Sequence, residues 1–144
     1  MPASTALQYH MSGTQYRVAH LAMIVSPVFA AHRDTVMLPS LETAGFAYEN
    51  FIKTMLVVDA VKESEFAYGK NGHDLLKLIE LSEQAGRNYD HLNLKDFVAF
   101  ISVYHGNYSL RYTSEHLTYR HPDPEPLQDN LMALQTFTRQ FVDY

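Results

Sequence analysis

The first helical pattern runs from Thr14 to about Arg33, where apolar residues recur at steps of three and four. This stripe consists of Val18, Leu21, Ala22, Val25 and Phe29. Because proline lacks the backbone N–H group that a helix interior needs, Pro27 predicts a kink or an end of the helix near Val25. Residues 1–13 are mostly polar, and we expect them to form a flexible lead-in to a single domain that covers residues 14–144.

A longer apolar stripe follows and predicts a second helix that opens at Pro39 and Ser40 and runs to about Val61. Its members are Leu41, Ala44, Tyr48, Phe51, Met55 and Val58. Residues 62–72 are polar and rich in glycine at their end, which predicts a loop.

Three shorter helices complete the pattern. Residues 71–74 are typical of a capped helix start, and Gly86 is typical of the end of the same helix. Asn93 and Asp96 indicate a fourth helix, and Asp123 with Pro124 indicates a fifth. Signals for strands are nearly absent. The sequence therefore predicts an all-α protein, an up-and-down bundle of about five helices.

Composition narrows the function classes. Hydrophobic residues make up 47% of the 144 residues, which is enough to form a core and excludes wholesale disorder. The net charge of −5 argues against a global electrostatic attraction to nucleic acid or to an anionic membrane. The longest apolar stretch, from Leu21 to Ala31, is interrupted and too short to span a bilayer. With no secretory signal pattern, we expect a cytoplasmic protein without membrane contact.

Metal and cofactor chemistry lacks its usual motifs. There is no cysteine, which excludes disulfides, thiolate nucleophiles and cysteine-ligated metals. The eight histidines form neither Glu-x-x-His nor His-Glu-x-x-His, and no glycine-rich phosphate loop occurs. We therefore expect no metal site and no cofactor.

Two segments carry a resemblance to a known family. Residues 47–56 read Ala-Tyr-Glu-Asn-Phe-Ile-Lys-Thr-Met-Leu, with Glu49 four residues before Lys53. Residues 72–78 read Gly-His-Asp-Leu-Leu-Lys-Leu. This pattern resembles the HEPN superfamily of small all-helical domains over about residues 14–85. The resemblance implies a homodimer, with a protein partner of the antitoxin or nucleotidyltransferase type.

Many HEPN members are metal-independent endoribonucleases of toxin and defence systems. They use an arginine and a histidine four to six residues apart, paired across a homodimer. Arg111 and His116 have this spacing, so the resemblance implies them as catalytic candidates. The family's toxin subgroup continues His-x-Tyr, whereas Tyr119 follows His116 one residue late. Arg87 and His91 are too close together to match.

The segment from Tyr104 to His121 is locally basic and aromatic. Arginine contacts phosphate and tyrosine stacks on bases, so these residues are typical of a surface that binds single-stranded RNA. Tyrosine and arginine are also enriched at protein interfaces, and Tyr104 and Tyr108 can instead be core residues of the fourth helix. The candidate binding residues are Tyr104, Tyr108, Tyr112, Tyr119 and Arg120.

Two further sites in the sequence have a structural interpretation that competes with a functional one. The spacing of Glu49 and Lys53 favours an ion pair within one helix, with a ligand contact of Lys53 as the alternative. His73 is expected to have a structural task where the third helix begins, with Asp74 interacting with the helix dipole.

The sequence thus leaves three hypotheses. The first in order is a non-catalytic HEPN-like module that binds protein or RNA. The second is a metal-independent endoribonuclease that uses Arg111 and His116. The third is an unrelated bundle that binds an apolar ligand in a cavity lined by Met23, Met55 and Phe100.

Overall fold

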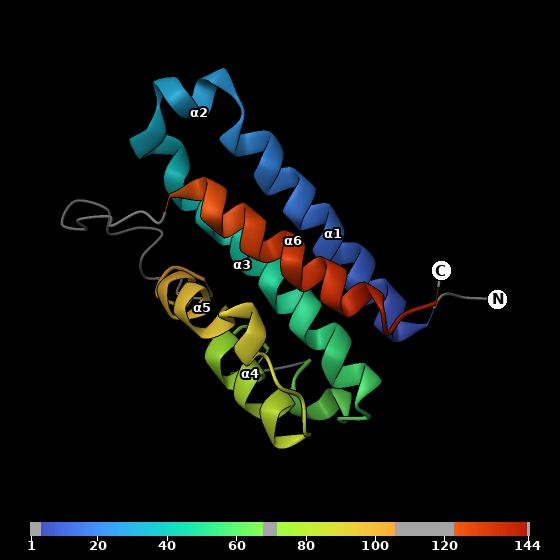
Figure 1. The fold of residues 1–144 in the computed structure, drawn as a ribbon. Coiled ribbons are helices and arrows are strands. Elements are labelled where there is room, and N and C mark those ends of the chain that lie inside the picture. The colour runs from blue at the N-terminus through green and yellow to red at the C-terminus, as the bar shows by residue number, and fades with distance from the viewer. Residues whose placement is uncertain (1–3, 68–71, 106–122, 144) are drawn as a thin grey trace.

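The computed structural model describes residues 4–67, 72–105 and 123–143, and it confirms the all-α class. Figure 1 shows the arrangement of its helices. They are α1 (Thr5–Ile24), α2 (Pro27–Ala31), α3 (Arg33–Val58), α4 (Leu75–Gln84), α5 (Leu94–Ser102) and α6 (Pro124–Arg139). Two short 3₁₀ turns cover Glu63–Glu65 and Asp90–Leu92. None of the described helices is long and apolar enough to cross a membrane.

Helix α3 is the central element, because all five other α-helices pack against it. Every residue from Phe51 to Leu56 is buried, so this part of α3 is enclosed on all sides. A helix that is apolar around most of its surface is stable only inside a core. Five of the six residues of the predicted stripe are buried in the core, namely Leu41, Ala44, Tyr48, Phe51 and Met55.

Helix α1 differs from its prediction in both position and orientation. It begins at Thr5 rather than at Thr14, and Ser4 caps it by accepting a hydrogen bond from the Leu7 N–H group. The buried face consists of small and polar residues, namely Ala6, His10, Gly13, Arg17 and His20. The apolar stripe that predicted the helix faces outward instead, with Val18 49% and Val25 69% exposed, except for Phe29, which lies on α2 and is buried. Hydrophobic periodicity missed the true start because the inward face is not hydrophobic.

The prolines explain the next two boundaries. As predicted, the first helix ends before Pro27, which then occupies the first turn of α2 behind the N-cap Ser26. This break makes six helices where about five were expected. The predicted start at Pro39 is wrong, because α3 begins at Arg33 and contains Pro39 in its interior. Met37 and Leu41 flank this proline and are both buried, so packing outweighs the hydrogen bond that proline omits.

The remaining helix ends agree with the sequence. Asp74 caps α4 by accepting a hydrogen bond from the Lys77 N–H group at 3.1 Å. Gly86 follows the C-cap of α4 with a φ of 101°, a left-handed conformation that favours glycine. Asp123 stands at the N-cap position of α6 with Pro124 in the first turn. Asn93 precedes α5 with a φ of 51° and makes no side-chain cap.

The interface between α1 and α6 is held by polar groups. The Arg17 guanidinium donates to the side-chain carbonyls of Gln128, at 2.9 Å, and Gln135. The Gln128 amide donates to His20 Nδ1 at 2.8 Å, and His10 Nδ1 lies 3.0 Å from Thr138 Oγ1. Ascending positions on α1 thus meet descending positions on α6, so the two helices are antiparallel. Buried polar groups with partners specify how the helices align.

Gly13 should tolerate no larger residue, although alanine normally stabilises a helix interior by about 1 kcal/mol over glycine. A Cβ atom at this position would lie 2.7 Å from the buried Phe51 ring. We expect Gly13→Ala to lower the free energy of unfolding by about 2 kcal/mol, because overpacking forces the two helices apart. Chemical denaturation measures this, with the exposed Gln15→Ala as the control on the same helix. Equal or greater stability of Gly13→Ala would contradict the close contact.

The buried His20 should make the fold sensitive to mild acid. Burial lowers the pKa of His20 from 6.5 to about 4, and the Gln128 amide donates to its unprotonated Nδ1. The neutral ring stabilises the fold fully above pH 6.5, and this stability is lost as the pH falls towards 4. The full difference corresponds to roughly 3 kcal/mol. In urea denaturation across this range, we expect His20→Asn to flatten the pH dependence while the exposed His32→Asn retains it.

Candidate functional site

Most of the predicted site residues lie outside the described part of the chain. These are Tyr108, Arg111, Tyr112, His116, Tyr119 and Arg120. Tyr104 is described and is only 7% exposed, with its ring centroid 5.6 Å from that of Phe100. Its ring is therefore a core group, as the alternative interpretation expected, and does not offer a free face for stacking. Tyr104 follows α5 rather than lying on it, because the helix ends at Ser102. The structure tests neither the catalytic nor the binding role of the other six residues.

A cluster of ionisable side chains surrounds Glu49 in the middle of α3, and we call Glu49, Lys53, His73 and His105 the Glu49 cluster. Lys53 follows Glu49 by one helical turn, and its Nζ atom lies 3.0 Å from Glu49 Oε2. Both side chains are only 6% exposed. The predicted ion pair within one helix is therefore confirmed. Because both charges are buried, it differs from the exposed pairs that contribute little to stability.

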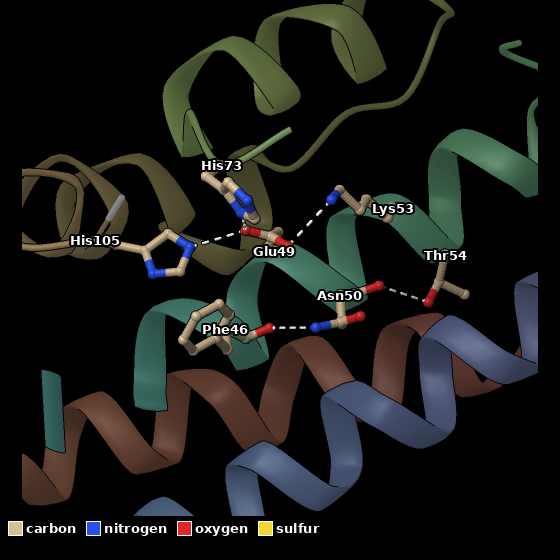
Figure 2. A network of polar contacts seen from close by, with 7 residues as sticks. All are labelled: Phe46, Glu49, Asn50, Lys53, Thr54, His73 and His105. Carbon is tan, nitrogen blue, oxygen red and sulfur yellow. Dashed lines mark hydrogen bonds and ion pairs between the residues drawn. The ribbon is translucent and has the colours of Figure 1, made fainter. Parts of the chain in front are cut away.

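Two histidines from other parts of the fold complete the cluster (Figure 2). His73, directly before the N-cap of α4, places Nδ1 2.8 Å from Glu49 Oε1. His105, shortly after α5, places Nε2 2.9 Å from the same oxygen. Figure 2 shows that this group lies on the side of α3 that faces α4 and α5, whereas α1 and α6 run along the other side. The structural task expected for His73 is thus to join the start of α4 to α3.

Aromatic and backbone contacts fix the ring of His105. The Phe46 ring meets the His105 ring edge-on with centroids 4.7 Å apart. The Tyr16 ring of α1 stacks on the Phe46 ring with centroids 5.1 Å apart. The ring of His105 also lies directly against the backbone of Gly45. A Cβ atom at Gly45 would lie 2.5 Å from His105 Nδ1, so only glycine leaves room for the ring. The side chain of His105 is 1% exposed.

Opposing effects set the charge of Glu49. Burial alone raises its pKa, but the hydrogen bonds from His105 and His73 and the charge of Lys53 outweigh burial, so the pKa lies below its ordinary value. Glu49 is therefore an ionised carboxylate, which only accepts hydrogen bonds. Both bonded ring nitrogens must then carry their protons. The contacts with Glu49 thus place a proton on His73 Nδ1 and a proton on His105 Nε2.

Three atoms of the cluster lie close enough together to suggest a metal site. Glu49, His73 and His105 each offer one ligand atom, all within 4.8 Å of one another. A metal on His105 Nε2 would shift the ring proton to Nδ1. A ligating histidine usually donates that second N–H group to a carboxylate, carbonyl or water. His105 Nδ1 is buried against Gly45 and has no hydrogen-bond partner among the described residues. The residues therefore fit a hydrogen-bonded cluster better than a metal centre.

The chemistry open to the cluster is limited by exposure. Glu49, Lys53 and His105 are buried, and only the His73 side chain reaches solvent, with 49% exposed. A carboxylate that accepts from Nδ1–H orients the ring and leaves Nε2 able to exchange a proton, as in catalytic acid–base pairs. The cluster thus offers one oriented proton-transfer group at its surface. The three buried members, Glu49, Lys53 and His105, have a structural role.

Arg87 and His91, the second arginine–histidine pair of the sequence, contact different partners in the structure. Arg87 forms a paired contact with the Asp59 carboxylate, with Nε 3.0 Å from Oδ2, and its guanidinium lies 4.6 Å from the Phe141 ring centroid. His91 instead contacts the Phe137 ring. Arg87 therefore connects the end of α3 to the segment after α4. Two residues that the third hypothesis expected in one apolar cavity have different surroundings. Met55 is buried in the core, whereas Phe100 lines an open groove on the surface of α5.

Comparisons of the chain with protein-family models, with curated proteins and with solved structures found no match. The HEPN resemblance thus rests on the residues quoted for it. Sequence reasoning identified Glu49, Lys53 and His73 but missed His105 as a member of the same cluster. A signal was present, because Gly45 lies four residues before Glu49 on one helix face, and glycine inside a helix usually indicates a close contact.

Removal of the Glu49 charge should destabilise the fold strongly. Glu49→Gln leaves the Lys53 ammonium buried without its partner, which typically costs about 3–5 kcal/mol. The exposed Glu80→Gln is the matched control and should cost less than about 1 kcal/mol. Urea denaturation at neutral pH measures both variants.

The double variant Glu49→Gln/Lys53→Met separates the unpaired charge from the lost hydrogen bonds. We expect it to be more stable than Glu49→Gln alone but less stable than the wild type, because His73 and His105 still lose their acceptor. A cost for Glu49→Gln that equals the cost for Glu80→Gln would contradict a buried, charged cluster.

Proposed function

We propose that the chain is a non-catalytic interaction module that binds single-stranded RNA through the segment from Tyr104 to His121. The observation that supports this proposal most is the attachment of the first two residues of the segment to the core. Tyr104 is buried, and the His105 ring is fixed between Gly45, Phe46 and the Glu49 carboxylate. A binding element with one fixed end loses less conformational entropy on binding.

The electrostatics next to this attachment do not oppose an anionic partner. The nearest buried carboxylate, Glu49, accepts from Lys53 Nζ and from two imidazole N–H groups. Its charge is therefore compensated and does not repel phosphate. Further along the chain, Arg111 and Arg120 supply guanidinium groups for phosphate, and Tyr112 and Tyr119 supply rings for stacking. This local composition allows an acidic protein to bind RNA.

The HEPN resemblance adds a catalytic alternative. Arg111 and His116 have the spacing of the family's metal-independent endoribonucleases, which pair these residues across a homodimer. Arginine stabilises the charge that develops on phosphate, and histidine transfers protons near neutral pH. The tyrosine displaced to position 119 is the reason to place binding ahead of cleavage.

A binding experiment with a defined probe tests the proposal. Fluorescence anisotropy with a labelled single-stranded RNA of mixed sequence, in excess EDTA, measures the dissociation constant over a salt series. We expect Tyr112→Ala/Tyr119→Ala to weaken binding at least about tenfold, because each base stacked on an aromatic ring contributes about 1–3 kcal/mol. Arg111→Ala/Arg120→Ala should weaken binding and reduce its salt dependence. The control is Lys62→Ala, which removes an exposed cation beyond the C-terminal end of α3 and has no contact with the Glu49 cluster.

The same samples separate the alternatives when the RNA is analysed on a denaturing gel. Cleavage by the wild type that Arg111→Ala/His116→Ala abolishes would overturn the non-catalytic proposal in favour of the endoribonuclease. Cleavage that instead depends on His73 would assign the reaction to the Glu49 cluster. Absence of binding by a folded wild-type protein would also overturn it, with a protein partner next to be tested.

A further inference from the structure

Helix α1 carries an apolar face that no described part of the chain covers. Ten large hydrophobic side chains are exposed among the described residues, and five of them recur in one pattern along α1, its C-cap and α2. They are Met11, Val18, Leu21, Val25 and Val28, and together with Met132 of α6 we call them the neutral face. The steps of seven, three and four residues from Met11 to Val25 match the spacing at which helices pack side by side in a coiled coil, and Val28 follows on α2 after the break at Ser26 and Pro27.

The rotation of α1 that exposes this face is fixed from inside. On the adjacent, buried side of α1, Gly13 lies against the Phe51 ring with no room for a Cβ atom. Arg17 and His20 are bound there by Gln128 and Gln135 of α6. Turning the apolar stripe inward would expel these polar groups and push side chains into α3. The stripe is therefore a persistent surface feature, and large exposed apolar patches typically mark interaction sites.

Met132 extends the neutral face onto α6. It lies between Gln128 and Gln135 in the sequence of α6, and these residues are the two partners of Arg17. Side chains three and four residues apart share one side of a helix, so Met132 flanks the α1–α6 interface. Its side chain is 44% exposed.

Charge favours a second copy of the chain as the occupant. All sixteen acidic residues occur at or after Asp34, and Arg17 is the only charged residue before Arg33. Arg17 is buried, so α1 presents no charge to solvent. The net charge is −5, and two copies therefore repel each other over most other orientations. When the neutral face meets its own copy, apolar groups are buried and no like charges are brought together.

We propose that two copies of the chain associate through the neutral face, with α1 of one copy packed along α1 of the other in a two-fold symmetric dimer. Symmetric pairing uses the same patch on both subunits, as most homodimers do. Val18 lies at the centre of the stripe that runs from Met11 to Val25, so it meets its own counterpart whether the helices run parallel or antiparallel. This interface is separate from the proposed RNA-binding segment and does not depend on it.

Light scattering after size-exclusion chromatography tests the proposal on the whole chain. The wild type should have twice the monomer mass of 16.5 kDa at high micromolar concentration. Val18→Glu should have the monomer mass, because two carboxylates then face each other in the interface. Leu76→Glu, at an exposed leucine of α4, is the matched control and should remain dimeric. Far-ultraviolet circular dichroism should show all variants folded, since the changed side chains are exposed.

A charge exchange makes the result specific to the symmetric contact. Val18→Lys alone should also be monomeric, but a mixture of Val18→Glu with Val18→Lys should recover the mass of a dimer. A wild type that is monomeric at high micromolar concentration would overturn the proposal, even where it binds lipid vesicles or another protein through the same face. A dimer that persists in Val18→Glu, or a mixture that stays monomeric, would overturn it too.

Discussion

The ionised carboxylate of Glu49 is the constraint on which the arrangement of α3, α4 and α5 depends. A charge with 6% exposure must be compensated within the protein, because water cannot solvate it. The compensation comes from one turn further along α3, from the residue before the α4 N-cap and from the residue that follows α5 by a short turn. The position of each helix end is therefore fixed by a hydrogen bond as well as by apolar packing, which alone has little directional preference.

The interactions that determine how the helices align differ between the two sides of α3. On the side of α4 and α5, alignment depends on the Glu49 cluster. On the side of α1 and α6 it depends on uncharged partners, because Arg17 meets two glutamine carbonyls and no carboxylate. Burial lowers the pKa of Arg17, as expected for a cation without an anionic partner. The energetic gain from such contacts is modest, and their main effect is to define which residues of α1 face α6.

The parts of the fold that the sequence predicted well are those where packing and propensity agree. The stripe from Leu41 to Val58 is buried where it was expected, and Asp74, Gly86 and Pro124 mark helix ends because each has a specific local role. Prediction was wrong where tertiary contacts outweighed local rules. Pro39 lies inside α3, and α1 begins well before its apolar stripe. The inward face of α1 follows from Gly13 and Arg17 fitting Phe51 and two glutamines, which no periodicity along the chain indicates.

The same distinction explains how much of the site was visible in the sequence. Glu49 and Lys53 are four residues apart, so helical geometry alone predicts their contact. His105 is 56 residues from Glu49, and its contact requires the relative placement of α3 and α5. One set of ring contacts then connects this cluster to α1, since Tyr16 of α1 stacks on Phe46, which meets His105 edge-on. Because Gly45 leaves the His105 ring no free space, a shift of α1 against α3 cannot be absorbed by Phe46 without displacing that ring. The fixed rotation of α1 therefore supports both the exposed apolar surface and the geometry around Glu49.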